Sequence, residues 1–238
     1  MLAVLESARN VACSGGRPLA VTDCLNFGNP ERQEMAWDLE EAVEGIALAC
    51  ESLKIPVVSG NVSLYNETDG QSIWPTPLVG CVGLVADVTL IPAAWREGDA
   101  VFVVGAPELS LDGSEYQSLF LGGHAGRPPQ PELAAEAALI QFLWRCSPVL
   151  TLAHDAAEGG LAVALAEAAI FSGIGARVEL DDDAVTWFGE GGGLAVVACE
   201  PEDESALEGM PYRRLGTVGG PKLLGVDVDE LADAYGAD

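Results

Sequence analysis

The sequence predicts a mixed fold of two modules, α+β in the first part of the chain and α/β in the second. Two observations lead to this class. Short apolar runs typical of buried strands alternate with stretches of helical periodicity along the whole chain. A chain of 238 residues that is 49% hydrophobic can also fill one large core or two modest ones. We expect residues 1–93 to form the first module and residues 94–238 the second, because Ile91-Pro92 ends an apolar run and Gly98-Asp99 opens the next.

The first module begins with a predicted helix over residues 2–12, whose apolar residues share one face and which Gly15-Gly16 ends. This helix starts at Met1 without a capping residue or a preceding strand, so we expect the chain to be the later portion of a longer one. The remaining predicted elements are strands at 18–22, 55–59 and 78–88, a helix at 31–53 and a turn at 69–70.

The second module keeps the same alternation of strands and helices. We predict strands at 100–104, 149–153, 176–180, 194–199 and 213–218, and helices at 132–145, 161–171 and 228–235. His124 lies among Gly122, Gly123 and Gly126, which favours a flexible exposed loop over a general base.

Charge and cysteine content narrow the function classes. With 11 basic and 37 acidic residues the net charge is −26, which opposes binding to nucleic acid and to anionic membranes. An anionic ligand would therefore need Mg²⁺, local arginines or backbone N–H groups to hold it. The six cysteines form no C-x-x-C pair, which argues against zinc and structural disulfides. The absence of a leader-like or membrane-length apolar segment favours a soluble cytoplasmic protein.

Two segments place short polar side chains and glycine where an apolar strand ends. They are Asp23-Cys-Leu-Asn-Phe-Gly-Asn-Pro30 and Ser59-Gly-Asn-Val-Ser-Leu-Tyr-Asn-Glu-Thr68. In a strand-to-loop turn, glycine lets backbone N–H groups approach a phosphate, and Asp, Asn and Ser oxygens suit magnesium. The structural alternatives are an Asx-turn at Asp23 and a Gly-Asn turn at Gly60-Asn61. Neither segment is a Walker A loop or a dinucleotide fingerprint.

These two segments closely resemble the second half of the large synthetase subunit of formylglycinamide ribonucleotide amidotransferase, the PurL family. The resemblance also covers Ala8–Cys13, Pro75-Thr-Pro77 and His154-Asp155 with Gly159-Gly-Leu161, in the same order and at similar spacing. It implies a PurM-like architecture, with a partial ferredoxin-like α+β module followed by an α/β module.

The resemblance also implies residue roles. Asp23 and Gly60 match positions that contact ATP, Asn61 matches an amide that ligates Mg²⁺, and Ser63 matches a serine that contacts the substrate. No catalytic residue is carried over. The sequence around Gly159-Gly160 predicts a helix N-terminus that attracts an anion or, about equally, a turn held by a structural His154. Ala157-Glu158 replaces the family's Ser-Asp there, and Glu190 is an auxiliary ligand candidate.

The implied reaction joins glutamine-derived ammonia to formylglycinamide ribonucleotide (FGAR) with ATP, giving the amidine (FGAM), ADP and phosphate. The family's proton-handling histidines and acidic magnesium ligands belong to the first half, so we expect this chain alone to be inactive. The implied partners are a chain carrying the N-terminal half, a PurQ-like glutaminase and a small PurS-like subunit.

Two alternatives remain open. One is a noncatalytic scaffold that serves assembly or nucleotide binding. The other is a different PurM-like enzyme, such as aminoimidazole ribonucleotide (AIR) synthetase or selenophosphate synthetase, acting as a homodimer.

Overall fold

The structure is a computed structural model that describes residues 1–123 and 125–236, so His124 lies outside the described residues. Its helices are α1 (Leu2–Cys13), α2 (Gln33–Leu53), α3 (Glu115–Phe120), α4 (Leu133–Cys146), α5 (Gly160–Ser172), α6 (Ala184–Phe188) and α7 (Val228–Tyr235), with short 3-10 helices η1 (Val88–Leu90), η2 (Ser147–Val149) and η3 (Pro201–Leu207). Its strands are β1 (Gly16–Asn26), β2 (Val57–Ser63), β3 (Glu67–Thr68), β4 (Gln71–Ser72), β5 (Thr76–Val85), β6 (Ala100–Val104), β7 (Leu152–Asp155), β8 (Ala176–Val178), β9 (Ala195–Cys199), β10 (Tyr212–Val218), β11 (Lys222–Leu223) and β12 (Val226–Asp227).

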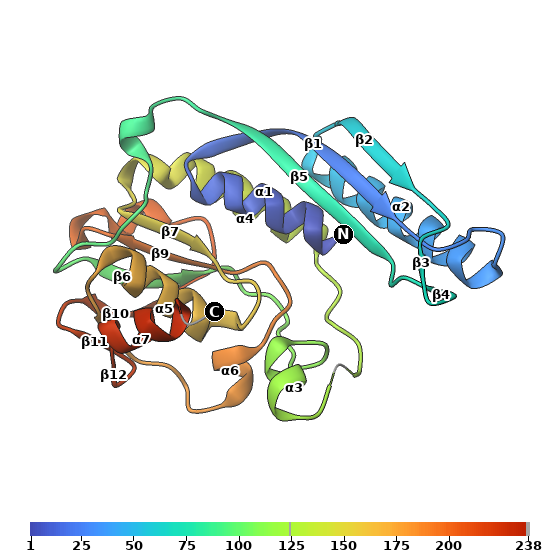
Figure 1. Cartoon of the computed structure of the whole chain (residues 1–238). Helices are drawn as coiled ribbons and strands as arrows, with labels where there is room; N and C mark the ends of the chain where they lie inside the picture. Colours follow the sequence, from blue (N-terminus) through green and yellow to red (C-terminus); the bar gives the residue numbers. More distant parts are fainter. Residues whose placement is uncertain (124, 237–238) are drawn as a thin grey trace.

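The first part of the chain forms a three-stranded sheet in the order β2-β1-β5 (Figure 1). Strand β1 pairs parallel with β2 and antiparallel with β5. Val21 and Leu25 of β1 are buried in one cluster with residues of α1 and α2, so these helices cover one face of the sheet. The opposite face carries no helix of the described residues, which leaves it open to solvent.

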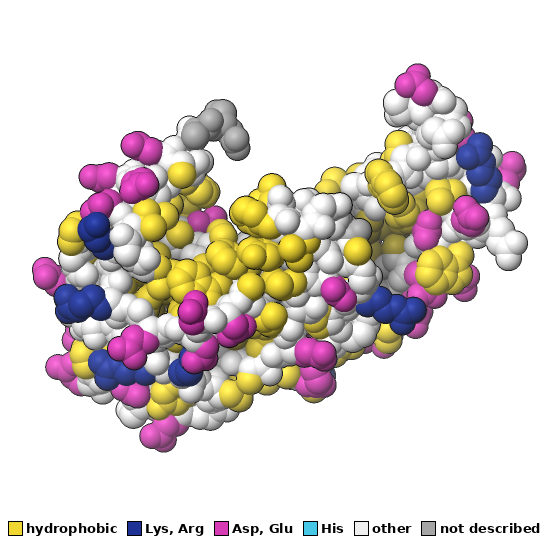
Figure 2. Space-filling model, turned by 90° about the horizontal axis from the view of Figure 1, so that it is seen from below, with side chains coloured by type: hydrophobic (Ala, Val, Ile, Leu, Met, Phe, Trp, Pro, Cys, Tyr) yellow, Lys and Arg dark blue, Asp and Glu magenta, His cyan; other side chains and the backbone are white. Residues whose placement is uncertain are grey.

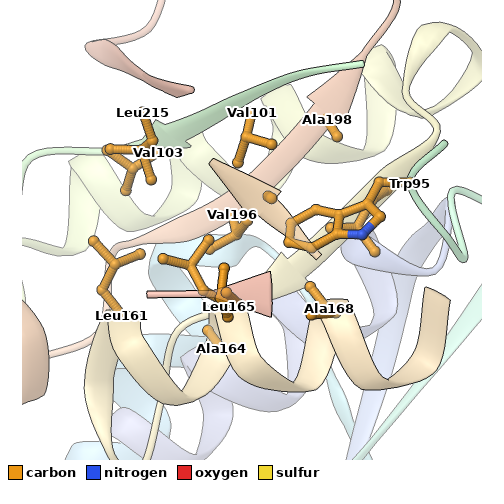
Figure 3. Close-up of a cluster of buried hydrophobic side chains, with 14 of the residues drawn as sticks. Trp95, Val101, Val103, Leu161, Ala164, Leu165, Ala168, Val196, Ala198 and Leu215 are labelled. Carbon is orange, nitrogen blue, oxygen red and sulfur yellow. The ribbon is translucent and has the colours of Figure 1, made fainter. Parts of the chain in front are cut away.

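The second part forms a seven-stranded sheet in the order β12-β11-β8-β10-β6-β9-β7, paired antiparallel except between β11 and β8. All residues of β6 and β9 are buried, because helices cover both faces. Val101 and Val103 pack toward α5, as Figure 3 shows, whereas Phe102 packs toward α4 and α1. Such alternation is expected when successive strand side chains point to opposite faces.

Helix α1 lies between the two sheets. Its Val4 and Leu5 belong to the core under the three-stranded sheet, and its Ala8 and Ala12 belong to the core shared with β6, β9 and α4. The guanidinium of Arg9 is buried at the same place, with 2% of the residue exposed. Helix α1 therefore packs both parts of the chain together.

The mixed fold class predicted from the sequence is confirmed, and most predicted helices and strands are present within a few residues of their expected ends. Helices α3 and α6 and the short strands β3, β4, β11 and β12 were not predicted. The predicted boundary at residues 93 and 94 lies between β5 and β6, although Ala93 forms an isolated bridge to Leu152 of β7. That boundary stays a prediction.

Acidic residues outnumber basic ones in the chain, 37 against 11. Figure 2 shows one face of the molecule, where apolar side chains form a band across the middle and acidic side chains outnumber basic ones around it. Among the described residues, no helix combines the length and apolar character that crossing a bilayer requires.

Candidate functional site

The structure brings the two polar segments together on neighbouring strands. The prediction that these residues stand in loops after their strands is wrong, because β1 continues to Asn26 and β2 continues to Ser63. Parallel pairing between the strands satisfies backbone groups that a loop would leave free. The paired positions are Asp23 with Gly60, Cys24 with Asn61, and Asn26 with Ser63.

The candidate residues lie on two faces of this sheet. Asp23 alternates with Val21 and Leu25, so its carboxylate is on the face covered by α1 and α2. Asn61 is next to Gly60 and opposite Cys24, so its amide is on the open face. Asp23 and Asn61 therefore cannot ligate one cation in this arrangement, although their backbones are adjacent.

The open face groups two amides and a thiol. The Asn61 Nδ2 atom donates to Cys24 Sγ at 3.6 Å, and the Asn26 Nδ2 atom donates to the same sulfur at 3.5 Å. Asn26 also donates to the carbonyl of Thr76 at 3.3 Å. Among the described residues the Asn61 Oδ1 atom has no hydrogen-bond partner, so it can accept a hydrogen bond or ligate a cation.

Glycine at position 60 is required by its neighbour across the strands. A Cβ atom built on Gly60 would collide with Asp23 Oδ1 and lie 3.1 Å from Asp23 Cγ. The carboxylate of Asp23 thus occupies the space over Gly60. Gly60 permits this close approach in addition to any contact with a ligand.

The turn after β2 is tied to the turn after β1 by hydrogen bonds. The Asn66 Nδ2 atom donates to the carbonyls of Ser63 at 2.9 Å and Phe27 at 3.1 Å. Ser63 Oγ donates to Asn66 Oδ1 at 3.2 Å. Ser63 is half-buried at this junction, so its hydroxyl is held in place at the end of the open face.

Just before α5, where the sequence suggested an anion site, the N–H of the capping residue Gly159 is bonded by a side chain of the protein. Glu190 Oε1 accepts hydrogen bonds from the N–H groups of Gly159 and Glu115, both at 2.9 Å. A carboxylate is the group that the partial positive charge of a helix N-terminus favours. Glu190 therefore joins α3, α5 and its own loop, whereas Glu158 is exposed to solvent.

His154 lies on β7 and contacts α5. Its Nε2 atom is 3.2 Å from Glu167 Oε2, and its Nδ1 atom is 2.8 Å from the carbonyl oxygen of Asp155. Burial lowers the pKa of His154, but the hydrogen bond to Glu167 and the nearby acidic charges outweigh it, so the pKa is raised. These contacts support the structural interpretation of His154.

A buried charge cluster was missed by the sequence reasoning. Arg9 Nε is 2.7 Å from Asp155 Oδ1, and Arg9 Nη1 is 2.7 Å from Glu136 Oε2. Burial opposes the charge on Arg9, but the two carboxylates raise the pKa of its guanidinium; burial also raises the pKa of Glu136. The available signal was an arginine within the apolar face of the first helix. The cluster joins α1, α4 and β7.

Within residues 1–123 and 125–236, no group of three or more His, Cys, Asp or Glu side chains is arranged to hold a metal ion. A cation on the open face would therefore take few ligands from this chain, such as the Asn61 amide oxygen. Magnesium commonly keeps several waters and uses one or two protein groups plus phosphates. The open face thus offers the Asn61 amide oxygen, a group that suits magnesium.

Comparisons with known proteins agree with the fold. The model of the AIR synthase related protein N-terminal domain matches residues 1–85, and that of the corresponding C-terminal domain matches residues 96–229. The chain is 46% identical over 98% of its length to phosphoribosylformylglycinamidine synthase subunit PurL of Thermobifida fusca, and 45% identical over 98% to PurL of an Anaeromyxobacter species. It spans about a third of the length of these relatives, 33% and 34%.

Solved structures of PurL proteins share the fold of this chain. Thermotoga maritima PurL complexed with ATP matches 91% of this chain and 31% of its own, with a TM-score of 0.59 and 25% identity. The same protein complexed with FGAR matches 97% of this chain and 42% of its own, with a TM-score of 0.72 and 19% identity. A chain of the PurLQS structure from that organism matches 97% of this chain and 41% of its own, with a TM-score of 0.67 and 18% identity. The chain belongs to the AIR synthase related protein family.

Proposed function

We propose that this chain is part of the ATP-dependent synthetase subunit of phosphoribosylformylglycinamidine synthase. This cytoplasmic ligase would convert FGAR, ATP and glutamine-derived ammonia into FGAM, ADP and phosphate. The observation that carries the proposal is the 45–46% identity to PurL subunits over nearly the whole chain. The two modules, residues 1–93 and 94–238, would correspond to the two matched domain types.

The open face of the three-stranded sheet is the part of the chain that would meet Mg²⁺ and FGAR. We assign the Asn61 amide oxygen to Mg²⁺ and the Ser63 hydroxyl to FGAR. Asp23 and Gly60 would contact ATP from the face that α1 and α2 cover, opposite Asn61, because the Asp23 carboxylate lies on that face. Mg²⁺ would neutralise phosphate charge, which matters in a chain with a net charge of −26.

A complementary polypeptide would cover the open face. Leu78, Val82 and Leu84 of β5 project there with 58%, 58% and 62% of their surfaces exposed. A row of large apolar side chains on a sheet face is typical of a surface that packs against another element. The occupant would be the N-terminal half of the synthetase. A PurQ-like glutaminase and a PurS-like subunit would complete the assembly, by analogy with the PurLQS assembly of Thermotoga maritima.

The proposal is tested by reconstitution. The chain is mixed with a polypeptide carrying the N-terminal half, and ADP formation is measured with FGAR, Mg²⁺, ATP and ammonium. We expect FGAR-dependent turnover from the mixture and none from either part. Asn61→Ala should lower kcat/KM at least tenfold and raise the Mg²⁺ requirement. Gln71→Ala, an exposed amide on the β3–β4 hairpin, should leave both unchanged.

The alternatives give different results. A noncatalytic nucleotide sensor would bind ATP without the second polypeptide and would not turn over FGAR in the mixture. A homodimeric enzyme of the same family would turn over a substrate without a second polypeptide. Its activity per chain would rise with chain concentration, because dimers form. Either result would contradict the proposed role.

A further inference from the structure

A pocket of about 450 Å³ lies between the start of β1, the end of α2 and the last turns of α4. Arg17, Lys54 and Arg145 line it, and none of the acidic residues that the structure describes does. The chain has 11 basic residues against 37 acidic ones. Three of those 11 converging on one acid-free pocket is unusual for such a chain.

The three cations lack a carboxylate partner within the described part of the chain. Among the residues that the structure describes, the arginine and lysine ion pairs use Arg9, Arg32, Arg213, Arg214 and Lys222. Arg17, Lys54 and Arg145 are not among them, although acidic side chains are abundant elsewhere. Their charges repel one another, so a bound anion would relieve that repulsion and offset the negative far field of the chain.

The pocket also has an apolar wall. Trp144, Leu19 and Ile140 line it beside the cations. The guanidinium of Arg17 lies over the Trp144 ring at 5.5 Å from the centroid, which orients both side chains. Lys54 is the residue that ends α2, with its backbone in the left-handed region at φ 57°. Apolar walls with a few convergent polar groups are typical of small-molecule sites of this volume.

This pocket is separate from the open face that carries Asn61. Arg17 and Leu19 are near the start of β1, and Lys54 precedes β2, whereas Asn61 pairs with Cys24 near the far end of both strands. At about 3.3 Å per strand residue, the two sites lie about 20 Å apart. A ligand in the pocket would therefore not occupy the proposed nucleotide-magnesium site.

We propose that this pocket binds a small organic phosphate. The phosphate group contacts Arg17, Lys54 and Arg145, and the carbon part of the ligand lies against Trp144 and the neighbouring apolar side chains. The three positive charges more than balance the two negative charges of a phosphate dianion, and an arginine fork pairs with two phosphate oxygens at once. The inference is independent of the proposed ligase function.

The test is direct binding by calorimetry, with inorganic phosphate, phenyl phosphate and phenol as probes for the full 238-residue chain. We expect phenyl phosphate to bind more tightly than inorganic phosphate and phenol not to bind. Affinity should fall as salt is raised, because the contacts are ionic. Arg145→Gln and Lys54→Asn should each weaken phenyl phosphate binding about tenfold or more, since each removes a charge-assisted contact. Asn at position 54 also tolerates the left-handed backbone.

Matched controls separate this site from general charge effects. Arg96→Gln removes an exposed arginine outside the pocket and should leave affinity unchanged. Asn61→Ala should also leave the affinity for phenyl phosphate unchanged, because Asn61 lies on the open face of the three-stranded sheet, away from the pocket. Equal weakening by Arg96→Gln, or binding that resists both pocket substitutions, would overturn the proposal. So would failure of both phosphates to bind while an acidic peptide does, since that result would assign the pocket to a protein segment.

Discussion

At the scale of single residues, Asp23 and Gly60 depend on each other. The carboxylate of Asp23 lies where a side chain at position 60 would project, on the face of the sheet that α1 and α2 cover. Glycine in a strand is unfavourable unless something needs the space. Here the Asp23 carboxylate needs the space, so the glycine at position 60 is explained without a ligand.

Gly60→Ala should therefore destabilise the chain by about 1–3 kcal/mol, because the new methyl group collides with Asp23 Oδ1. In an Asp23→Ala background the same change should be neutral or stabilising by about 0.5–1 kcal/mol, since alanine is favoured over glycine in a strand. Urea denaturation of the four chains measures both effects. An equal cost of Gly60→Ala in both backgrounds would show that the carboxylate is not the obstacle.

At the scale of elements, His154 connects β7 to the helices on one face of the seven-stranded sheet. Its ring pairs with Glu167 of α5 and stacks on Phe171, with centroids 6.4 Å apart. Phe171 in turn meets Tyr235 of α7 edge-on at 5.8 Å. Other acidic groups near this ring are Asp155, Glu6 and Glu158, which line a pocket with it.

The pH dependence of stability follows from this contact. Because the pKa of His154 is raised on folding, the protonated ring stabilises the fold below its ordinary pKa of 6.5, and this contribution is lost as pH rises through the folded-state value. A double-mutant cycle of His154→Gln and Glu167→Gln should give a larger coupling free energy at about pH 5.5 than at about pH 8.5.

The control for this cycle is a pair of exposed partners elsewhere. Arg213 and Asp181 are 3.1 Å apart with most of the Asp181 side chain exposed, and this pair contains no histidine. Their coupling should be small and should not vary with pH. An equal coupling free energy of His154 and Glu167 at both pH values would mean that protonation of the His154 ring does not strengthen this contact.

At the scale of the whole molecule, the two sheets differ in how they are covered. The seven-stranded sheet has helices on both faces, whereas the three-stranded sheet has helices on one. The apolar row Leu78, Val82 and Leu84 is consequently exposed on the open face. The shape of the described chain therefore leaves one large apolar surface available for association.

Val82→Asp should block this association without unfolding the chain. Because Val82 is exposed, we expect the free energy of unfolding to change by no more than about 0.5 kcal/mol. Binding of the N-terminal half, measured by sedimentation of the mixture, should weaken at least tenfold, since a charge would be buried unpaired. Leu119→Asp introduces the same charge on α3, another exposed apolar site, and should not affect binding. Unchanged binding by Val82→Asp would exclude the open face as the interface.

Much of the fold could be predicted because its signals are local. Strand β6 and helix α7 were predicted with their observed ends, since a run of apolar residues and a period of 3.6 residues are properties of neighbouring positions. Helices α3 and α6 were missed because they are short and half-exposed, so no apolar periodicity marks them. Strands β1 and β2 were predicted to end too early. Their polar ends stay in the sheet because the two strands pair with each other there.

The sequence by itself determined the mixed fold, the alternation of elements and the two polar segments, because each depends on residues close together in the chain. The tertiary structure decided which side chains share a face. Strand pairing put Asp23 and Asn61 on opposite faces, and helix packing enclosed Arg9 between Asp155 and Glu136, 146 and 127 positions away. The basic pocket of Arg17, Lys54 and Arg145 also arises only when α2 and α4 meet at the start of β1, since contacts between distant segments leave no local pattern.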